Sequence, residues 1–413
     1  MGEATALAAV LAVYQRRGEV ANDCLYAEVK ESLGFTDDDY ARRETIGRDT
    51  RKHCVATRAI RWYQQSLRRM NLVERVPGRR GVWRLRGALE KELTPAAAGM
   101  TLVGFSTQLG VALWSSCDVF KGITEPCALI LTSPPYALAK PRRYGNPPER
   151  EIVEFIVRSL EPIVKNLLPG GSVVVVTGND VFVSGTPARS LYVERLVLAL
   201  HEELGLALMD RLVWHQKNKA PGPMAWASGT RQQLNVAYEH CLWFTNDPIR
   251  CFADNRRVLM PHSEQHRKLM EAGGERRDLS SADGAYTLRA GRSFAQSTPG
   301  RIPRNVLEFT QHGREIAEAR RAVRAFGLPL HGAVMPLGLA AFLIRFLTRE
   351  GDLVVDPFGG FGTTARAAED AGRRWLMTER IAEYVVGQAI RLRDAAGFRN
   401  SIPLDLNHRL SFA

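Results

Sequence analysis

The sequence that decides the fold reads Leu353-Val354-Val355-Asp356-Pro357-Phe358-Gly359-Gly360-Phe361-Gly362-Thr363-Thr364. Its apolar start predicts a buried strand, its glycines predict a tight loop, and its threonines predict the first turn of a helix. Glycines allow the backbone of such a loop to approach a ligand closely. The acid that ends the strand, Asp356, is positioned to accept a hydrogen bond from an amino group of that ligand.

A second acid has the spacing of a ribose-binding residue. Glu379 ends the next apolar stretch, Trp375-Leu376-Met377, and an acid about 20 residues beyond a glycine loop can bind ribose hydroxyls. A nicotinamide or flavin site would carry G-x-G-x-x-G, which seats a pyrophosphate on a helix N-terminus. Asp-Pro-Phe takes the place of that opening here, which argues against a nicotinamide oxidoreductase.

Another motif lies upstream, where Ala128-Leu129-Ile130-Leu131 leads into Thr132-Ser133-Pro134-Pro135-Tyr136. The apolar run predicts a buried parallel strand, and open α/β sheets place their chemistry at the carboxyl ends of such strands. The two prolines fix the backbone and remove N–H donors, which leaves carbonyl groups as acceptors. The motif therefore offers hydrogen-bond acceptors and one aromatic ring at the edge of the sheet.

Together the two motifs resemble the D-P-F-x-G-x-G-T-T and [D/N/S]-P-P-[Y/F] signatures of DNA amino-methyltransferases that depend on S-adenosylmethionine. Phe361 departs from the first signature, where the family commonly has Ser. Asp118 fits the acid that contacts the adenine amine, and Pro336 begins a segment similar to the helix over the methionine end. The resemblance implies the following cofactor-binding residues: Asp356, Phe358, Gly359, Gly360, Gly362, Thr363, Thr364, Glu379, Asp118 and Pro336.

The same resemblance implies that Ser133, Pro134, Pro135 and Tyr136 are the catalytic residues. The exocyclic amine of a base is a poor nucleophile because its lone pair is delocalised into the ring. Ser133 Oγ and the Pro134 carbonyl would localise that lone pair, and Tyr136 would stack on the base. The Ser form resembles cytosine-N4 enzymes more than adenine-N6 enzymes, which usually carry Asp. A C5-cytosine enzyme would need a cysteine after Pro-Pro, and Cys127 precedes the strand.

The order of the motifs is also informative, because the catalytic strand precedes the cofactor strand by more than 200 residues. That order resembles the circularly permuted β group of the family, over about residues 112–392. The implied fold class is α/β, with a circularly permuted Rossmann-like methyltransferase domain over residues 101–413. The polar, basic region from about 220 to 325 lies where the family carries an inserted target-recognition region. Lys217, Lys219 and Arg231 are its candidate DNA-binding residues.

Residues 1–90 predict a separate small unit. A helix is expected over 54–70, followed by strands at 73–76 and 82–85 around a Pro-Gly turn. Arg58 and Arg61 lie on the helix, and Arg79 and Arg80 lie at the turn. The pattern resembles the N-terminal winged-helix domain of some restriction-associated proteins, which implies that these arginines bind DNA. A packing or dimerisation domain with solvated arginines is the alternative, and residues 94–99 predict a linker.

Composition supports a polyanionic partner. The formal net charge is +12 and the pI is about 9.7, and clustered Lys and Arg attract phosphates. The six cysteines are scattered with no Cys-x-x-Cys spacing, so we expect no metal site and no disulfide framework. No apolar run reaches membrane-spanning length and no secretory signal is recognisable, which predicts a cytoplasmic protein without membrane contact.

The resulting hypothesis is a site-specific methyltransferase that acts on N4 of cytosine in double-stranded DNA, as part of restriction–modification. The chain shows no nuclease motif, so a restriction endonuclease acting on the same site would be a separate protein. Two alternatives stay open: an adenine-N6 methyltransferase, and a DNA-binding regulator whose methyltransferase domain only senses the cofactor. Intact Ser133, Tyr136, Asp356 and Glu379 argue against the regulator.

Overall fold

The computed structural model describes residues 3–45, 52–69, 73–85, 93–137, 142, 145–311, 313–326 and 328–401. The chain divides into two compact units, residues 1–92 and residues 93–413. The predicted linker at 94–99 belongs to the second unit. Thr94 donates from its backbone N–H to Glu383 at 2.9 Å, and Ala96 N donates to the Arg380 carbonyl at 2.7 Å. These bonds hold Thr94 and Ala96 against the unit, and a turn closed by a bond from Met100 N to the Ala97 carbonyl follows them.

The first unit combines helices with a small antiparallel sheet. Its elements are α1 (Glu3–Arg17), β1 (Glu19–Ala21), α2 (Asn22–Leu33), α3 (Asp37–Ala41), β2 (Arg43–Thr45), β3 (Lys52–Cys54), α4 (Val55–Arg69), β4 (Val73–Arg75) and β5 (Val82–Leu85). The main sheet has the order β1-β5-β4. Ile60, Gln64 and Leu67 lie one turn apart on α4 and are buried, as helical spacing predicts. Gln64 is satisfied there by Tyr14 Oη and Asn22 Oδ1.

The second unit is built on one mixed sheet. In its described part the strand order is β14-β10-β11-β9-β8-β15-β16-β7-β6-β17. The strands are β6 (Thr101–Ser106), β7 (Gly110–Ser115), β8 (Cys127–Thr132), β9 (Leu167–Gly178), β10 (Ala207–His215), β11 (Tyr238–Thr245), β14 (Val306–Glu308), β15 (Leu353–Asp356), β16 (Arg374–Glu379) and β17 (Arg399–Asn400). The central run β9-β8-β15-β16-β7 is parallel throughout.

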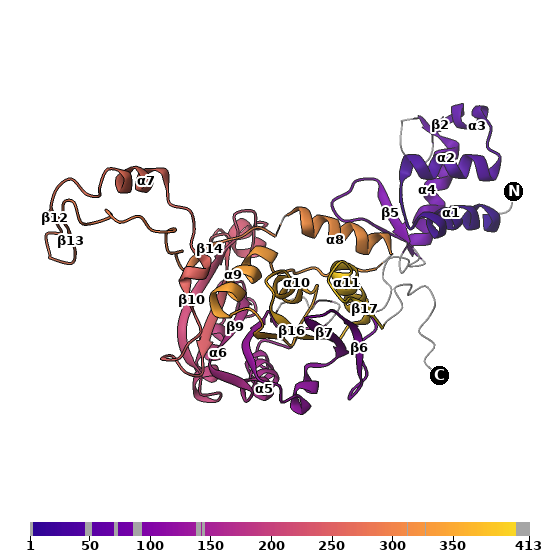
Figure 1. The fold of residues 1–413 in the computed structure, drawn as a ribbon. Coiled ribbons are helices and arrows are strands. Elements are labelled where there is room, and N and C mark those ends of the chain that lie inside the picture. Colours follow the sequence, from indigo (N-terminus) through magenta and orange to yellow (C-terminus); the bar gives the residue numbers. More distant parts are fainter. Residues whose placement is uncertain are drawn as a thin grey trace. The chain divides into compact units, whose positions relative to one another are not determined.

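Helices cover both faces of this sheet (Figure 1). α5 (Ile152–Val164) and α6 (Tyr192–Glu202) pack on one face, and α9 (Leu337–Leu347), α10 (Thr363–Asp370) and α11 (Ala382–Leu392) pack on the other. Successive residues of β8 point to opposite faces, because side chains alternate along a strand. Ile130 accordingly belongs to the core under α5 and α6, and Leu129 and Leu131 belong to the core under α9 and α10. This double burial explains the unbroken apolar runs.

The region from 220 to 325 is not one continuous insertion. Its strand β11 lies inside the sheet between β10 and β9, and α8 (Arg314–Ala325) packs on α11. Strand β11 could not be predicted from the sequence pattern because polar segments flank it on both sides. The excursion outside the sheet is shorter and contains α7 (Glu264–Glu271) and the hairpin β12 (Leu279–Ser280) and β13 (Thr287–Leu288), closed at its base by a bridge between Met260 and Arg301. No helix in the described ranges is long and apolar enough to cross a bilayer.

Candidate active site

The two sequence motifs meet at the carboxyl edge of the sheet. β8 and β15 are adjacent and parallel, with Val354 opposite Leu129 and Val355 opposite Ile130. Thr132 and Asp356, the last residues of these strands, are joined by a hydrogen bond of 2.7 Å from Thr132 Oγ1 to Asp356 Oδ1. The two segments that follow these strands therefore start side by side, one at Ser133 and the other at Pro357.

Asp356 organises the glycine loop from beneath. Its Oδ1 accepts from Thr132 Oγ1 at 2.7 Å and from the Phe358 N–H at 3.0 Å, and its Oδ2 accepts from Thr364 Oγ1 at 2.7 Å. Burial raises the pKa of this carboxyl above its ordinary value, and the three donors oppose that shift. These bonds use most of the acceptor capacity of the carboxylate, so its first role is to hold the loop.

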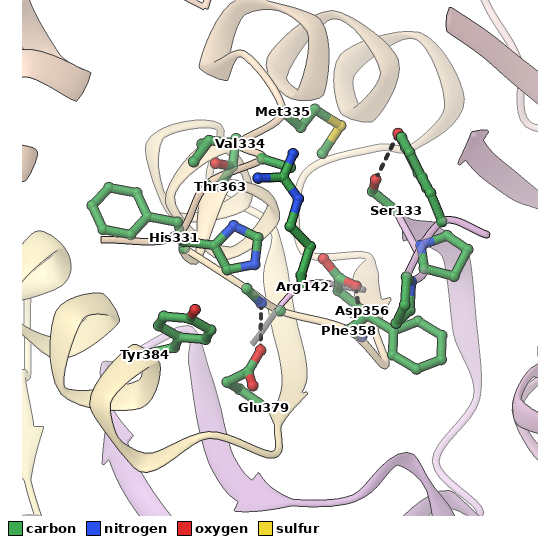
Figure 2. Close-up of a pocket in the computed structure, with 18 of the residues that line it drawn as sticks. Ser133, Arg142, His331, Val334, Met335, Asp356, Phe358, Thr363, Glu379 and Tyr384 are labelled. Atoms are coloured by element: carbon green, nitrogen blue, oxygen red, sulfur yellow. Dashed lines mark hydrogen bonds between the residues drawn. The ribbon is translucent and has the colours of Figure 1, made fainter. Parts of the chain in front are cut away.

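Glu379 ties the far side of the loop to the next strand. It accepts from the Gly360 N–H and from the Ile381 N–H, each at 2.8 Å. Burial raises its pKa to about 7. One lone pair on each oxygen stays available for a ligand. Figure 2 shows Asp356 between Ser133 and Glu379 in that view, with the bond from Gly360 to Glu379 drawn as a dashed line.

A cavity of about 800 Å³ connects the two motifs. Among the predicted residues, those that line it are Ser133, Pro134, Pro135, Tyr136, Asp118, Asp356, Phe358, Gly359, Gly360, Thr363, Thr364, Glu379 and Lys219. Phe358 packs in it against Phe155, with ring centroids 5.6 Å apart. Asp118 lies at its margin, where Lys121 donates to it at 2.7 Å and lowers the pKa of the carboxyl.

Several predicted residues lie elsewhere. Gly362, at a φ of 72°, is the N-cap of α10, and Pro336 is the N-cap of α9; neither is among the residues that line the cavity. Near the start of α9, the residues that line the cavity are Val334 and Met335, which precede Pro336. Lys217 is exposed and pairs with Glu308 at 2.6 Å, and Arg231 is an exposed residue with a φ of 61°.

The four predicted DNA-binding arginines of the first unit, Arg58, Arg61, Arg79 and Arg80, are exposed. Arg61 donates from Nε to the Tyr26 hydroxyl at 2.5 Å and stacks over that ring, and Arg79 pairs with Glu19. Arg58 lies on α4, and Arg80 lies in the turn between β4 and β5. The turn is thus charged at its tip, as the sequence predicts.

The segment from Ser133 to Tyr136 is held by a hydrogen-bond network that could not be predicted from the sequence motifs. Tyr136 Oη lies 3.2 Å from Ser133 Oγ and donates to Glu239 Oε2 at 2.8 Å. Gln216 and Lys219 donate to the other oxygen of Glu239, at 2.9 and 3.1 Å. Burial and the Glu239 charge raise the pKa of Tyr136 well above its ordinary value, so its hydroxyl stays protonated.

A signal for Glu239 was present in the sequence. It is an acid within Tyr238-Glu239-His240-Cys241-Leu242-Trp243-Phe244, a strand that is otherwise largely apolar, and buried acids require partners. Lys219, a predicted DNA-binding residue, lines the cavity and pairs with Glu239. Further lining residues outside the predicted site set are Asn146, which donates to the Tyr136 carbonyl at 2.7 Å, and the half-buried His331, whose pKa is lowered by desolvation to about 4.

Comparison with known proteins agrees with this geometry. The DNA methylase family model matches residues 127–390, more than half of the chain. The type II methyltransferase M.PvuII of Proteus hauseri is 32% identical over 65% of this chain and 79% of its own length. The type II methyltransferase M.BglII of Bacillus subtilis is 25% identical over 62% of this chain and 61% of its own length.

Among solved structures, the PvuII DNA methyltransferase (cytosine-N4-specific) superposes with a TM-score of 0.53 at 27% identity. The match covers 72% of this chain and 90% of that chain. The second unit therefore has the methyltransferase fold, with its large mixed sheet. On the family match and on these relatives, the chain belongs to the N4/N6 family of DNA methyltransferases, which depend on S-adenosylmethionine.

Proposed function

We propose that this chain transfers the methyl group of S-adenosylmethionine to N4 of cytosine in duplex DNA, at a specific site. The observation that carries the proposal is the position of Ser133 at the end of β8, in one cavity with the glycine loop of β15. A serine in that position, and a relative whose name gives cytosine-N4 specificity, favour cytosine over adenine.

The residues of the cavity fit the cofactor. Glu379 retains acceptor capacity for ribose hydroxyls, Phe358 and Ile381 offer apolar walls, and Asp118 offers an exposed carboxylate for the adenine amine. Thr363 and the glycine backbone line the portion beside His331 and Met335. When bound, S-adenosylmethionine supplies an electrophilic methyl group.

Ser133 and Pro134 would orient the attacking amine. Their acceptors, Ser133 Oγ and the Pro134 carbonyl, direct the two N–H bonds of the amine and thereby aim its lone pair across the cavity. Tyr136 provides the ring on which the base stacks, and no covalent bond to the protein forms. Because N4 is paired inside the duplex, the cytosine must rotate out of the helix, at a cost of a few kcal/mol.

We assign DNA contact to both units. The first unit, with its helices, its three-stranded sheet and exposed Arg58, Arg61, Arg79 and Arg80, supports a winged-helix role. We propose that the second unit is circularly permuted. Its candidate contacts with the DNA target are Lys217, Arg231 and the excursion between β11 and β14. We also propose a role in restriction–modification, with a separate restriction endonuclease, which the names of the type II relatives support.

The test is methyl transfer to genomic DNA of mixed sequence, read by mass spectrometry of the nucleosides, with Ser133→Ala assayed alongside. We expect N4-methylcytosine that is lost in the variant. N6-methyladenine would contradict the base assignment and leave the amine chemistry in place. Cofactor and DNA binding without any methylated base would favour the regulator.

A further inference from the structure

The serine of the catalytic motif presents a problem of hydrogen-bond direction. A carboxylate or carbonyl is always an acceptor, but a serine hydroxyl has one proton and two lone pairs, and it rotates freely. Ser133 Oγ helps the target amine only if its lone pairs face the cavity, because a proton aimed at the amine would compete for the nitrogen lone pair. Something must therefore hold the proton of Ser133 on the other side.

We propose that Glu239 is a positioning residue that fixes this direction through Tyr136, an inference that rests on the proposed amine methylation. Glu239 is 8% exposed, and all of its described partners are donors: Tyr136 on Oε2, and Gln216 and Lys219 on Oε1. Since all three partners donate and one of them is an ammonium, the Glu239 side chain acts as the acceptor in each of these bonds. The single proton of the Tyr136 hydroxyl is therefore donated to Glu239.

Because each hydroxyl has one proton, the direction of the bond between Tyr136 and Ser133 follows. Tyr136 Oη and Ser133 Oγ lie 3.2 Å apart, and either could donate. Since the Tyr136 proton is already directed at Glu239, Ser133 must donate to the Tyr136 oxygen. Both lone pairs of Ser133 Oγ are then left for the amine. Glu239 thus makes the serine an acceptor without touching the substrate.

The packing around Tyr136 keeps the hydrogen bonds from Ser133 through Tyr136 to Glu239 in place. The Asn146 amide donates to the Tyr136 carbonyl at 2.7 Å, which fixes the backbone. Gly178 lies against the ring, and a Cβ at that position would be 2.9 Å from Tyr136 Cδ2. Because residue 178 at the end of β9 has no side chain, the Tyr136 ring has room to reach Glu239 on the adjacent strand β11.

The decisive variant is Glu239→Gln, which keeps the shape of the side chain. Lys219 and Gln216 hold the carbonyl oxygen of the new amide, which turns its NH₂ toward Tyr136. The direction of the hydrogen bonds then reverses: Tyr136 donates to Ser133, and the Ser133 proton points into the cavity. We expect kcat to fall about 10- to 100-fold, the range of one charge-assisted hydrogen bond. The KM for S-adenosylmethionine and the melting temperature should stay within twofold and within a few degrees of wild type.

A second variant separates direction from structure. Tyr136→Phe removes the relay, so adding Glu239→Gln to it should cost less than twofold more, whereas independent effects would multiply. Glu383→Gln is the matched control, because Glu383 is also buried but accepts from Thr94 outside the cavity; we expect it to retain wild-type kcat.

The inference is overturned if Glu239→Gln keeps kcat within twofold, or if its effect multiplies with that of Tyr136→Phe. A loss of cofactor binding in Glu239→Gln would equally overturn it in favour of a structural role. These outcomes differ from failure of the proposed function, in which the wild-type chain itself methylates no base.

Discussion

Thr132 and Asp356 lie 224 positions apart in sequence, and a buried hydrogen bond of 2.7 Å joins their side chains. This bond is the direct link between the strand that carries Ser133 and the strand that carries the glycine loop. Because Asp356 is buried, each of its donors offsets part of the free-energy cost of burying its charge.

Replacing Thr132 with Val should therefore weaken both stability and cofactor binding. Valine keeps the shape but removes the donor, so we expect a loss of about 1–3 kcal/mol in the free energy of unfolding and a higher dissociation constant for S-adenosylmethionine. Thr245→Val is the matched control, since Thr245 is buried and donates to the Gly171 carbonyl at 2.7 Å away from the cavity. Denaturation and calorimetry check both; equal cofactor affinity in the two variants would contradict the link.

Cofactor affinity should depend on the ionisation of Glu379. Its pKa is raised to about 7 by burial, so the carboxylate that accepts ribose hydroxyls dominates above pH 7 and the neutral acid dominates below it. We expect affinity to fall roughly tenfold between pH 8 and pH 6, the change in ionised fraction for that pKa. Titration calorimetry across this range checks the result. Glu379→Gln removes the titrating group and should flatten the profile; an unchanged slope would assign the pH dependence to the cofactor.

The two lysines that follow β10, Lys217 and Lys219, should behave differently. Lys219 is paired to Glu239 in the cavity, so Lys219→Met should lower kcat and leave the salt dependence of DNA binding unchanged. Lys217 is exposed, and Lys217→Met should weaken DNA binding similarly for all sequences, with a slope of log K against log salt reduced by about 1. Filter binding at several salt concentrations, with single-turnover methylation, distinguishes them. Identical phenotypes would count against this division of roles.

Arg58 and Arg80 test the role of the first unit. If both neutralise phosphates, the double variant Arg58→Ala/Arg80→Ala should reduce the salt slope by about 2. Arg16→Ala is a control within the same unit, because Arg16 pairs with Glu28 at 3.1 Å. An unchanged slope in the double variant would support a packing or dimerisation role for the unit.

Much of the fold could be predicted from local patterns. The apolar runs before Ser133 and Pro357 indicated parallel strands buried on both faces, and they are neighbours in the sheet. Helix α4 and strands β4 and β5 lie where spacing and the Pro-Gly turn placed them. Strand β11 was missed because its polar flanks made the whole of 220–325 look irregular, although the residues from Cys241 to Thr245 are all buried in the paired strand.

The sequence by itself identified the residues that we propose for the chemistry: Ser133, Tyr136, Asp356 and Glu379 stand in short motifs whose spacing is fixed by a strand end and the loop after it. Only the tertiary structure decided that Glu239 and Lys219 join them, and that Pro336 and Gly362 cap helices instead of lining the cavity. The physical reason is that strand pairing and side-chain hydrogen bonds connect positions more than a hundred residues apart. Local spacing carries no information about which distant strand will lie alongside.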